Sequence, residues 1–109
     1  MKNNKQCIFC KIVRDELPSK TVFEDKDIKA FWDINPQADV HIIIIPKKHI
    51  NTINTMKKED INLVGNMVYT AKKIAKDFKL KGYKLIFSVE KEGGQEIFHI
   101  HLHLIGNKK

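Results

Sequence analysis

The chain has 109 residues, of which 42% are hydrophobic and 30% are charged. This composition excludes a chain that is disordered throughout, and no apolar run approaches the ~20 residues that a membrane-spanning helix needs. Twenty basic and 13 acidic residues give a net charge of +7, which favours anionic partners such as nucleotides.

Basic residues are almost all lysine, because Arg14 is the only arginine. Proteins that read a base sequence depend on arginine for bidentate contacts, so we do not expect nucleic acid as a partner. The lysines are scattered, and we interpret them as a solvated surface. Residues 1–6 are polar and lead into no signal-like apolar stretch. We therefore expect a cytoplasmic protein with no membrane partner.

The first half of the chain predicts short elements. Residues 1–6 are expected to form a flexible tail, and the apolar segment 8–13 is expected to form a short helix or turn. Two strands are predicted at 21–24 and 28–32, with a polar hairpin-like connection between them. The segment 40–45 is rich in β-branched residues and stops at a proline, which predicts a buried strand.

The second half predicts one long helix, over residues 59–78, and two further strands, at 83–88 and 97–105. The apolar positions of the helix recur at steps of three and four residues: Ile61, Val64, Met67, Val68, Ala71, Ile74, Ala75 and Phe78. Mainly antiparallel strands with one main helix indicate an α+β domain.

Three histidines alternate with apolar residues near the end of the chain: His99, His101 and His103. Side chains alternate between the two faces of a strand, so these three share one face at a spacing of ~6.6 Å. The other face is expected in the core and holds Phe98, Ile100, Leu102 and Leu104. A single buried histidine is usually a core residue. Three on one face indicate a site, since imidazole serves as a nucleophile, proton shuttle or metal ligand.

Two shorter motifs suggest contacts with a nucleotide. Gly93-Gly94-Gln95 precedes the histidines, and glycines let backbone amides approach a phosphate closely. A loop that needs positive φ explains the glycines nearly as well, so only the adjacent histidines favour the phosphate. Asp33 follows aromatic strand residues and can accept hydrogen bonds from a ribose, but taken alone it is better interpreted as the cap of the following turn.

Cys7 and Cys10 are separated by two residues, which is typical of half a zinc site or a redox pair. A redox pair requires a strand that leads into a helix, and the polar residues upstream do not supply that strand. Zinc requires two more ligands, for which His41, His49 and His99 are candidates. Two free buried thiols are the third interpretation.

Together these motifs resemble the histidine triad family, whose signature is three histidines alternating with hydrophobic residues. The segments 31–37, 45–50 and 93–96 also fall in the family order, and Hint-type nucleotide-binding proteins are the most similar branch. The resemblance covers residues 8–106. It implies one domain over residues 7–109, with an α+β fold whose antiparallel sheet extends across a homodimer.

The resemblance implies binding of purine nucleoside monophosphates and hydrolysis of their phosphoramidates, such as AMP linked to an amine or to lysine. His101 matches the nucleophile that forms a nucleotidyl-histidine intermediate, and His103 and His41 match residues that orient groups and move protons. The nucleotide-binding positions that match the family are Phe9, Phe31, Asp33, Ile34, Ile43, Ser88, Gln95, Glu96, His101 and His103. Ser88 stands where many Hint-type members have asparagine, which weakens that contact. Glu96 stands where some members carry serine and others glutamate, which leaves the leaving-group preference open.

Some bacterial members carry zinc, and their ligand positions match Cys7, Cys10, His49 and His99. Such a zinc would be structural, because all four ligand positions are filled. No redox or organic cofactor is implied.

Two other functions remain open at this stage. One is hydrolysis of dinucleoside polyphosphates, which the segment 93–96 disfavours. The other is a zinc-containing module that binds nucleotides or a protein without turnover, against which the intact His101 and His103 argue.

Overall fold

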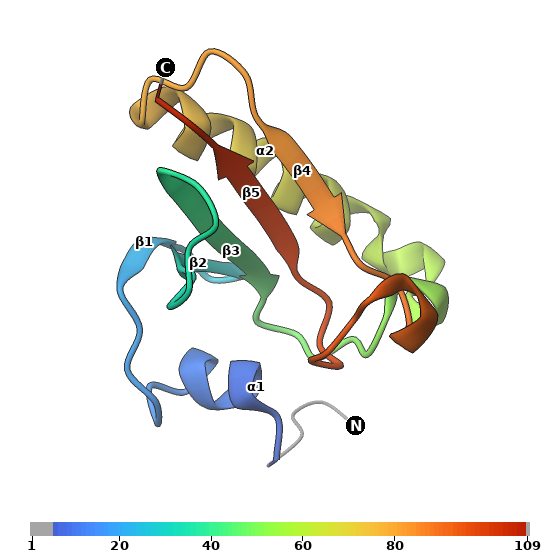
Figure 1. Ribbon diagram of the computed structural model, residues 1–109. Coiled ribbons are helices and arrows are strands. Elements are labelled where there is room, and N and C mark those ends of the chain that lie inside the picture. The colour runs from blue at the N-terminus through green and yellow to red at the C-terminus, as the bar shows by residue number, and fades with distance from the viewer. Residues whose placement is uncertain (1–5, 109) are drawn as a thin grey trace.

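A computed structural model describes residues 6–108 of the chain (Figure 1). In chain order the elements are α1 (Ile8–Val13), β1 (Thr21–Glu24), β2 (Ile28–Trp32), β3 (Val40–Pro46), the 3₁₀ helices η1 (Ile53–Thr55) and η2 (Lys58–Asp60), α2 (Ile61–Asp77), β4 (Lys84–Phe87), η3 (Lys91–Gly93) and β5 (Leu102–Gly106). The tail predicted for residues 1–6 lies, apart from Gln6, outside the described residues.

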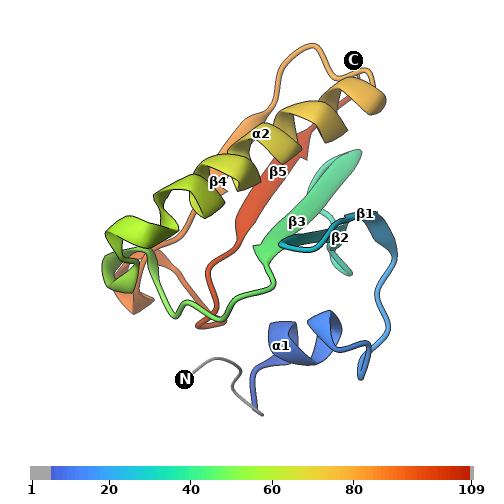
Figure 2. The same cartoon turned by 180° about the vertical axis from the view of Figure 1, so that it is seen from behind.

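The five strands form one antiparallel sheet in the order β1-β2-β3-β5-β4. β1 and β4 are therefore the edge strands, and β3 and β5, which carry site residues, lie inside. The long helix α2 runs along one face of this sheet (Figure 2). The α+β fold with one long helix is confirmed. No helix within residues 6–108 is long and apolar enough to cross a membrane.

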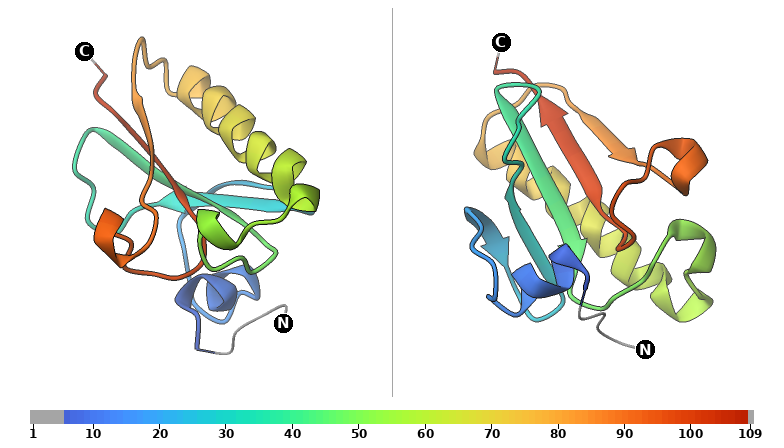
Figure 3. Two further views of the ribbon diagram at one scale, coloured as in Figure 1. Left: turned by 90° about the vertical axis from the view of Figure 1, so that its right-hand side faces the viewer. Right: turned by 60° about the horizontal axis from the view of Figure 1, so that its bottom comes forward.

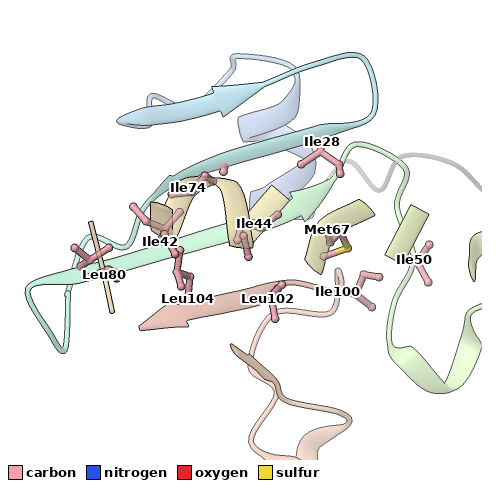
Figure 4. Packing of buried hydrophobic residues seen from close by; sticks show 14 residues of the cluster. Ile28, Ile42, Ile44, Ile50, Met67, Ile74, Leu80, Ile100, Leu102 and Leu104 are labelled. Carbon is pink, nitrogen blue, oxygen red and sulfur yellow. The ribbon is translucent and has the colours of Figure 1, made fainter. Parts of the chain in front are cut away.

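The main core lies between α2 and the sheet. Ile42 and Ile44 of β3 and Leu102 and Leu104 of β5 are fully buried and point toward Met67 and Ile74 of α2 (Figure 4). Strand alternation explains why these even-numbered strand positions share the core face. The site residues predicted at odd-numbered strand positions must therefore lie on the opposite face.

The buried arc of α2 is narrower than the apolar pattern predicted. Ile61 and Val68 are exposed, which contradicts the prediction that they belong to the buried stripe. Both lie at the edge of the arc centred on Met67 and Ala71. Val68 and Thr70 lie equally far from this centre on opposite sides, yet only Thr70 is buried.

On the opposite face of the sheet, α1 packs near the end of β3 (Figures 1 and 3). A second apolar cluster forms there from Cys7, Phe9, Cys10, Ile12, Phe31, Ile43 and Ile45. We call this set the α1 cluster. It joins α1 to β2 and β3 on the face that carries the histidines.

The last strand begins later than predicted, at Leu102 instead of residue 97. β3 ends at Pro46, and the last pair between β3 and β5 joins Ile44 to Leu102. Proline has no backbone N–H to extend the ladder, so the chain before Leu102 bends away, and Ile100 N–H donates to the Ile50 carbonyl instead (2.8 Å). Phe98 consequently lies exposed, and its predicted place in the core is wrong.

Candidate active site

One row of paired residues crosses four strands on the α1 face. Phe31 pairs with Ile43, Ile43 with His103, and His103 with Ile86. The row sets one triad histidine beside apolar side chains in the middle of the sheet. The His101 ring lies next to it, with 5.0 Å between the two ring centroids, so the predicted shared face brings these two imidazoles together.

His101 is held in one tautomer by the backbone. Its Nδ1 lies 2.9 Å from the carbonyl oxygen of His99, and a carbonyl can only accept a hydrogen bond, so Nδ1 carries the proton. Nε2 therefore keeps its lone pair. The side chain is only 8% exposed, and this burial lowers its pKa. The result is a neutral imidazole with a free nitrogen, which is the form that acts as a nucleophile.

His41 and His103 form a directed pair. The backbone N–H of Gln37 donates to His41 Nδ1 (3.2 Å), so the proton of the neutral ring is on Nε2. This Nε2–H lies 2.9 Å from His103 Nδ1, and His103 therefore carries its own proton on Nε2. Burial, with His101 and His41 adding to it, lowers the pKa of His103 to about 4. His103 thus presents an N–H donor beside His101.

Asp33 supports both the turn and the histidine pair. Its Oδ1 accepts a hydrogen bond from Asn35 N–H (2.8 Å), which is the turn cap predicted from the sequence. Its Oδ2 lies 3.4 Å from His41 Nε2. Ligand atoms of Asp33, His41 and His103 all lie within 4.8 Å of one another. The carboxylate is therefore placed to stabilise a proton on this pair.

An apolar wall stands beside His101. The Phe9 ring lies edge-on to His101, with 5.0 Å between centroids, and 5.8 Å from the Phe31 ring. Phe9, Phe31 and Ile43 are all buried. Ile34 behaves differently, because it is 91% exposed and does not belong to the packed wall.

Gln95 holds the glycine-containing loop in place. It is buried, its side-chain amide donates to the carbonyls of Asn51 (2.8 Å) and Ile97 (3.0 Å), and its Oε1 accepts from Glu90 N–H (2.8 Å). Both amide hydrogens are engaged by these bonds. Its backbone N–H also donates to the Glu90 carbonyl (3.0 Å). Both the side chain and the backbone amide of Gln95 thus act within the protein scaffold.

The same loop contains the positive φ that the glycines suggested. Gly94 has φ +92°, and Ser88 Oγ lies beside it. Glu96 is exposed at the end of the loop. Glu90 was not anticipated from the sequence: its φ is +65°, and its carboxylate accepts a hydrogen bond from Thr52 Oγ1 (2.8 Å). No local pattern predicts a glutamate in this conformation.

A second cluster lies where α1 meets the segment before β5. Sγ of Cys10 lies 3.1 Å from His49 Nδ1 and 3.5 Å from His99 Nδ1, and Sγ of Cys7 lies 3.4 Å from His99 Nδ1. In a tetrahedron with Zn–S bonds of about 2.3 Å and Zn–N bonds of about 2.0 Å, the ligand atoms are about 3.5 Å apart. The four residues therefore fit a zinc ion. His41, the other candidate ligand, contacts His103 instead.

The ring orientations in this cluster also suit a metal. His99 Nε2–H donates to the Pro46 carbonyl (2.8 Å), and His49 Nε2–H donates to Asn51 Oδ1 (2.6 Å). Both Nδ1 lone pairs then face the sulfurs, and such outer contacts are typical of metal-binding histidines. Burial lowers the pKa of His99 to about 4 and raises the pKa of the Cys7 thiol, so metal binding there would release thiol protons.

Comparison with known proteins gives consistent matches. A family model described as "Scavenger mRNA decapping enzyme C-term binding" matches residues 6–109. A HIT-like protein of Buchnera aphidicola is 46% identical over 106 residues, covering 95% of each chain. The purine nucleoside phosphoramidase of Escherichia coli is 43% identical over 106 residues, which cover 95% of this chain and 89% of that protein. The crystal structure of a HIT family hydrolase from Legionella pneumophila superposes with a TM-score of 0.91 at 53% identity, covering 93% of this chain and 92% of that chain.

Proposed function

This chain belongs to the histidine triad family, and we propose from that membership and from its site that it hydrolyses purine nucleoside phosphoramidates. The proposed reaction releases a nucleoside monophosphate such as AMP from its link to an amine or to lysine. The name of the relative at 43% identity supports this substrate class, and so does the apolar wall beside two adjacent imidazoles.

The observation that carries the proposal is the tautomer of His101. With Nδ1–H bound to the His99 carbonyl, Nε2 is the only ring nitrogen able to attack. In the first step the Nε2–phosphorus bond forms and the phosphorus–nitrogen bond to the amine breaks. This replaces one difficult displacement by water with two easier steps.

His103 is the proposed proton donor to the leaving amine. The negative phosphate of the substrate raises the proton affinity of the imidazoles that it meets, so the His41–His103 pair takes up one proton with the substrate. His103 Nε2–H then passes a proton to the amine nitrogen as the bond breaks. In the second step His103 accepts a proton from water, the water oxygen bonds to phosphorus, and the bond to His101 breaks.

The nucleotide would lie along the apolar wall. Phe9, Phe31 and Ile43 would face the base, and the exposed Ile34 would close over it. Asp33 would accept hydrogen bonds from the ribose hydroxyls. For the phosphate, we propose the backbone N–H of Glu96 together with Ser88, and this N–H would stabilise the charge that develops there. Gln95, whose own backbone N–H donates to the Glu90 carbonyl (3.0 Å), would hold the loop in place beside the phosphate.

We propose that Cys7, Cys10, His49 and His99 hold a structural zinc ion. When bound, the ion would supply a cross-link between α1 and the segment before β5, since the four protein ligands fill its coordination. The reaction steps above use only the protein side chains.

We further propose that residues 7–109 form one domain and that two copies form a homodimer through β4. This strand is one edge of the sheet, and Tyr83 and Ile86 remain partly exposed there. Exposed apolar side chains along an edge strand favour pairing with another chain.

The test is the release of AMP from adenosine 5′-phosphoramidate, with His101→Ala beside the parent protein. We expect turnover by the parent and loss of at least about 10³-fold in the variant, because the covalent step needs the imidazole. Quenching the parent during turnover should also trap a nucleotide on His101, detected by mass spectrometry.

Two results would contradict this function. AMP binding without any turnover by the parent would indicate the binding module, and faster cleavage of a dinucleoside polyphosphate than of the phosphoramidate would indicate the other hydrolase.

A further inference from the structure

Lys29 stands out as a buried cation on an apolar face. It lies in β2, pairs with Ile45 of β3, and is only 2% exposed. By strand alternation it shares the α1 face with Phe31. Lysine is almost never fully buried unless its ammonium group has partners, so the contacts of Lys29 reveal what the residue does.

The ammonium group of Lys29 binds the end of α1. Nζ donates to the carbonyl of Ile12 (3.0 Å) and to Asp15 Oδ1 (3.0 Å), and Glu24 Oε1 lies 3.8 Å away. Ile12 is in the last turn of α1, and its carbonyl also accepts the backbone N–H of Asp15 (3.0 Å), so Nζ uses the second lone pair of this oxygen. A cation at this end of a helix also interacts favourably with the helix dipole.

α1 needs such an anchor because it has only six residues, and isolated helices of this length do not persist in water. Its first turn is held by Cys7 and Cys10, which contact His49 and His99. Lys29 holds the other end. The helix is therefore fixed to the sheet at two points.

Phe9 lies between these two points, on the buried side of α1. Its ring contacts the rings of His101 and Phe31. A shift of α1 would move this ring away from the nucleophile and open the apolar wall. The position of Phe9 consequently depends on both anchors of the helix.

We propose that Lys29 is a positioning residue of the active site: its ammonium group holds the C-terminal end of α1 on the sheet and so keeps Phe9 against His101 and the bound base. This inference rests on the proposed function, because it assigns the wall formed by Phe9 to the nucleotide base.

The contact with the Ile12 carbonyl matters more than the ion pair. The Asp15 side chain is 80% exposed, and solvent weakens ion pairs at exposed carboxylates. The Ile12 carbonyl is fixed by the helix and faces the buried Nζ. Asp15→Asn therefore provides a matched control, and asparagine tolerates the φ of +60° found at this position.

The experiment compares Lys29→Met with the parent protein by calorimetric titration with AMP and with ribose 5-phosphate. We expect the affinity for AMP to fall about tenfold, and the affinity for ribose 5-phosphate, which has no base, to stay within twofold. Trypsin cleavage after Lys11 and Arg14 should accelerate in the variant, because α1 is released more often. Asp15→Asn should match the parent in all three measurements.

If Lys29 had a purely structural role, the variant would lose affinity for AMP and for ribose 5-phosphate equally, and that result would overturn the proposal. Unchanged affinity for AMP in a folded Lys29→Met protein would overturn it as well. Should Lys29→Met not fold, as judged by thermal melting, Lys29→Gln takes its place with the same criteria. Turnover of the parent tests the proposed function separately. If the parent protein binds AMP but cleaves no phosphoramidate, the proposed function is refuted. The comparison of AMP affinities still tests whether Lys29 positions Phe9 against the base.

Discussion

In each histidine of the two clusters, a hydrogen bond to one ring nitrogen determines which nitrogen carries the proton and which keeps its lone pair. A carbonyl fixes His101 and His99, an amide side chain fixes His49, and a backbone N–H fixes His41. His41 in turn fixes His103 through its Nε2–H. His99 and His101 are only two residues apart, yet one turns its lone pair toward sulfur and the other toward the site. Backbone contacts thus give two histidines of one sequence motif the different roles that we propose for them, metal ligand and nucleophile.

The assigned role of His103 predicts a dependence on the leaving group. His103→Ala should slow cleavage of an AMP–alkylamine substrate by about 10²–10⁴-fold, the usual contribution of a general acid. Cleavage of the p-nitrophenyl ester of AMP should slow far less in this variant, because p-nitrophenolate leaves without a proton. Single-turnover rates of both substrates measure the difference. His41→Ala should show the same trend, and equal losses for both substrates would contradict the assignment of His103 as the acid.

At the level of single residues, the sequence could predict the chemistry but not every environment. The pairing of His101 with His103 follows from strand alternation, and the turn cap at Asp33 follows from its neighbours. Lys29, however, was expected at a solvated surface and is buried, because the end of α1 supplies its partners from a segment 14 to 17 residues earlier. The contacts of Gln95 likewise come from a distant carbonyl, at Asn51.

Among the elements, α1 combines a short length with contacts to both clusters of the candidate site. It is short, its N-cap is the side chain of Cys7, and it contacts the sheet through the α1 cluster and through Lys29. The local sequence pattern predicted the bounds of α1, and it also predicted the bounds of β1 and β2. It could not predict the late start of β5, since that depends on where Pro46 ends the neighbouring strand.

Removal of the metal should therefore act mainly on α1. We expect about one zinc per chain in the purified protein, measured by mass spectrometry, and a melting temperature several degrees lower after chelation. A ligand at 100 times its Kd stabilises a fold by about 2.7 kcal/mol. Cys10→Ser should lose the zinc and respond no further to the chelator. Full zinc content in Cys10→Ser would contradict the assignment of this ligand set.

Over the whole molecule, the sheet separates stability from chemistry by its two faces. The face toward α2 carries the main core, and the face toward α1 carries the histidines and the α1 cluster. Because side chains alternate along each strand, this division could be predicted from the sequence. The edge strands could not, because the local pattern of each strand does not give the strand order β1-β2-β3-β5-β4, which places β1 and β4 at the edges.

The edge at β4 predicts how two copies associate. Ile86 is 38% exposed on this strand, and a partner strand would cover it and satisfy the free backbone groups of the edge. We expect sedimentation equilibrium to show a dimer, and Ile86→Lys to raise its dissociation constant at least tenfold, because a charge would enter the interface. Thr21→Lys on β1, the other edge strand, is the matched control and should stay dimeric. If Thr21→Lys dissociates the protein and Ile86→Lys does not, the interface lies at β1, and a monomeric parent would show that neither edge forms a dimer.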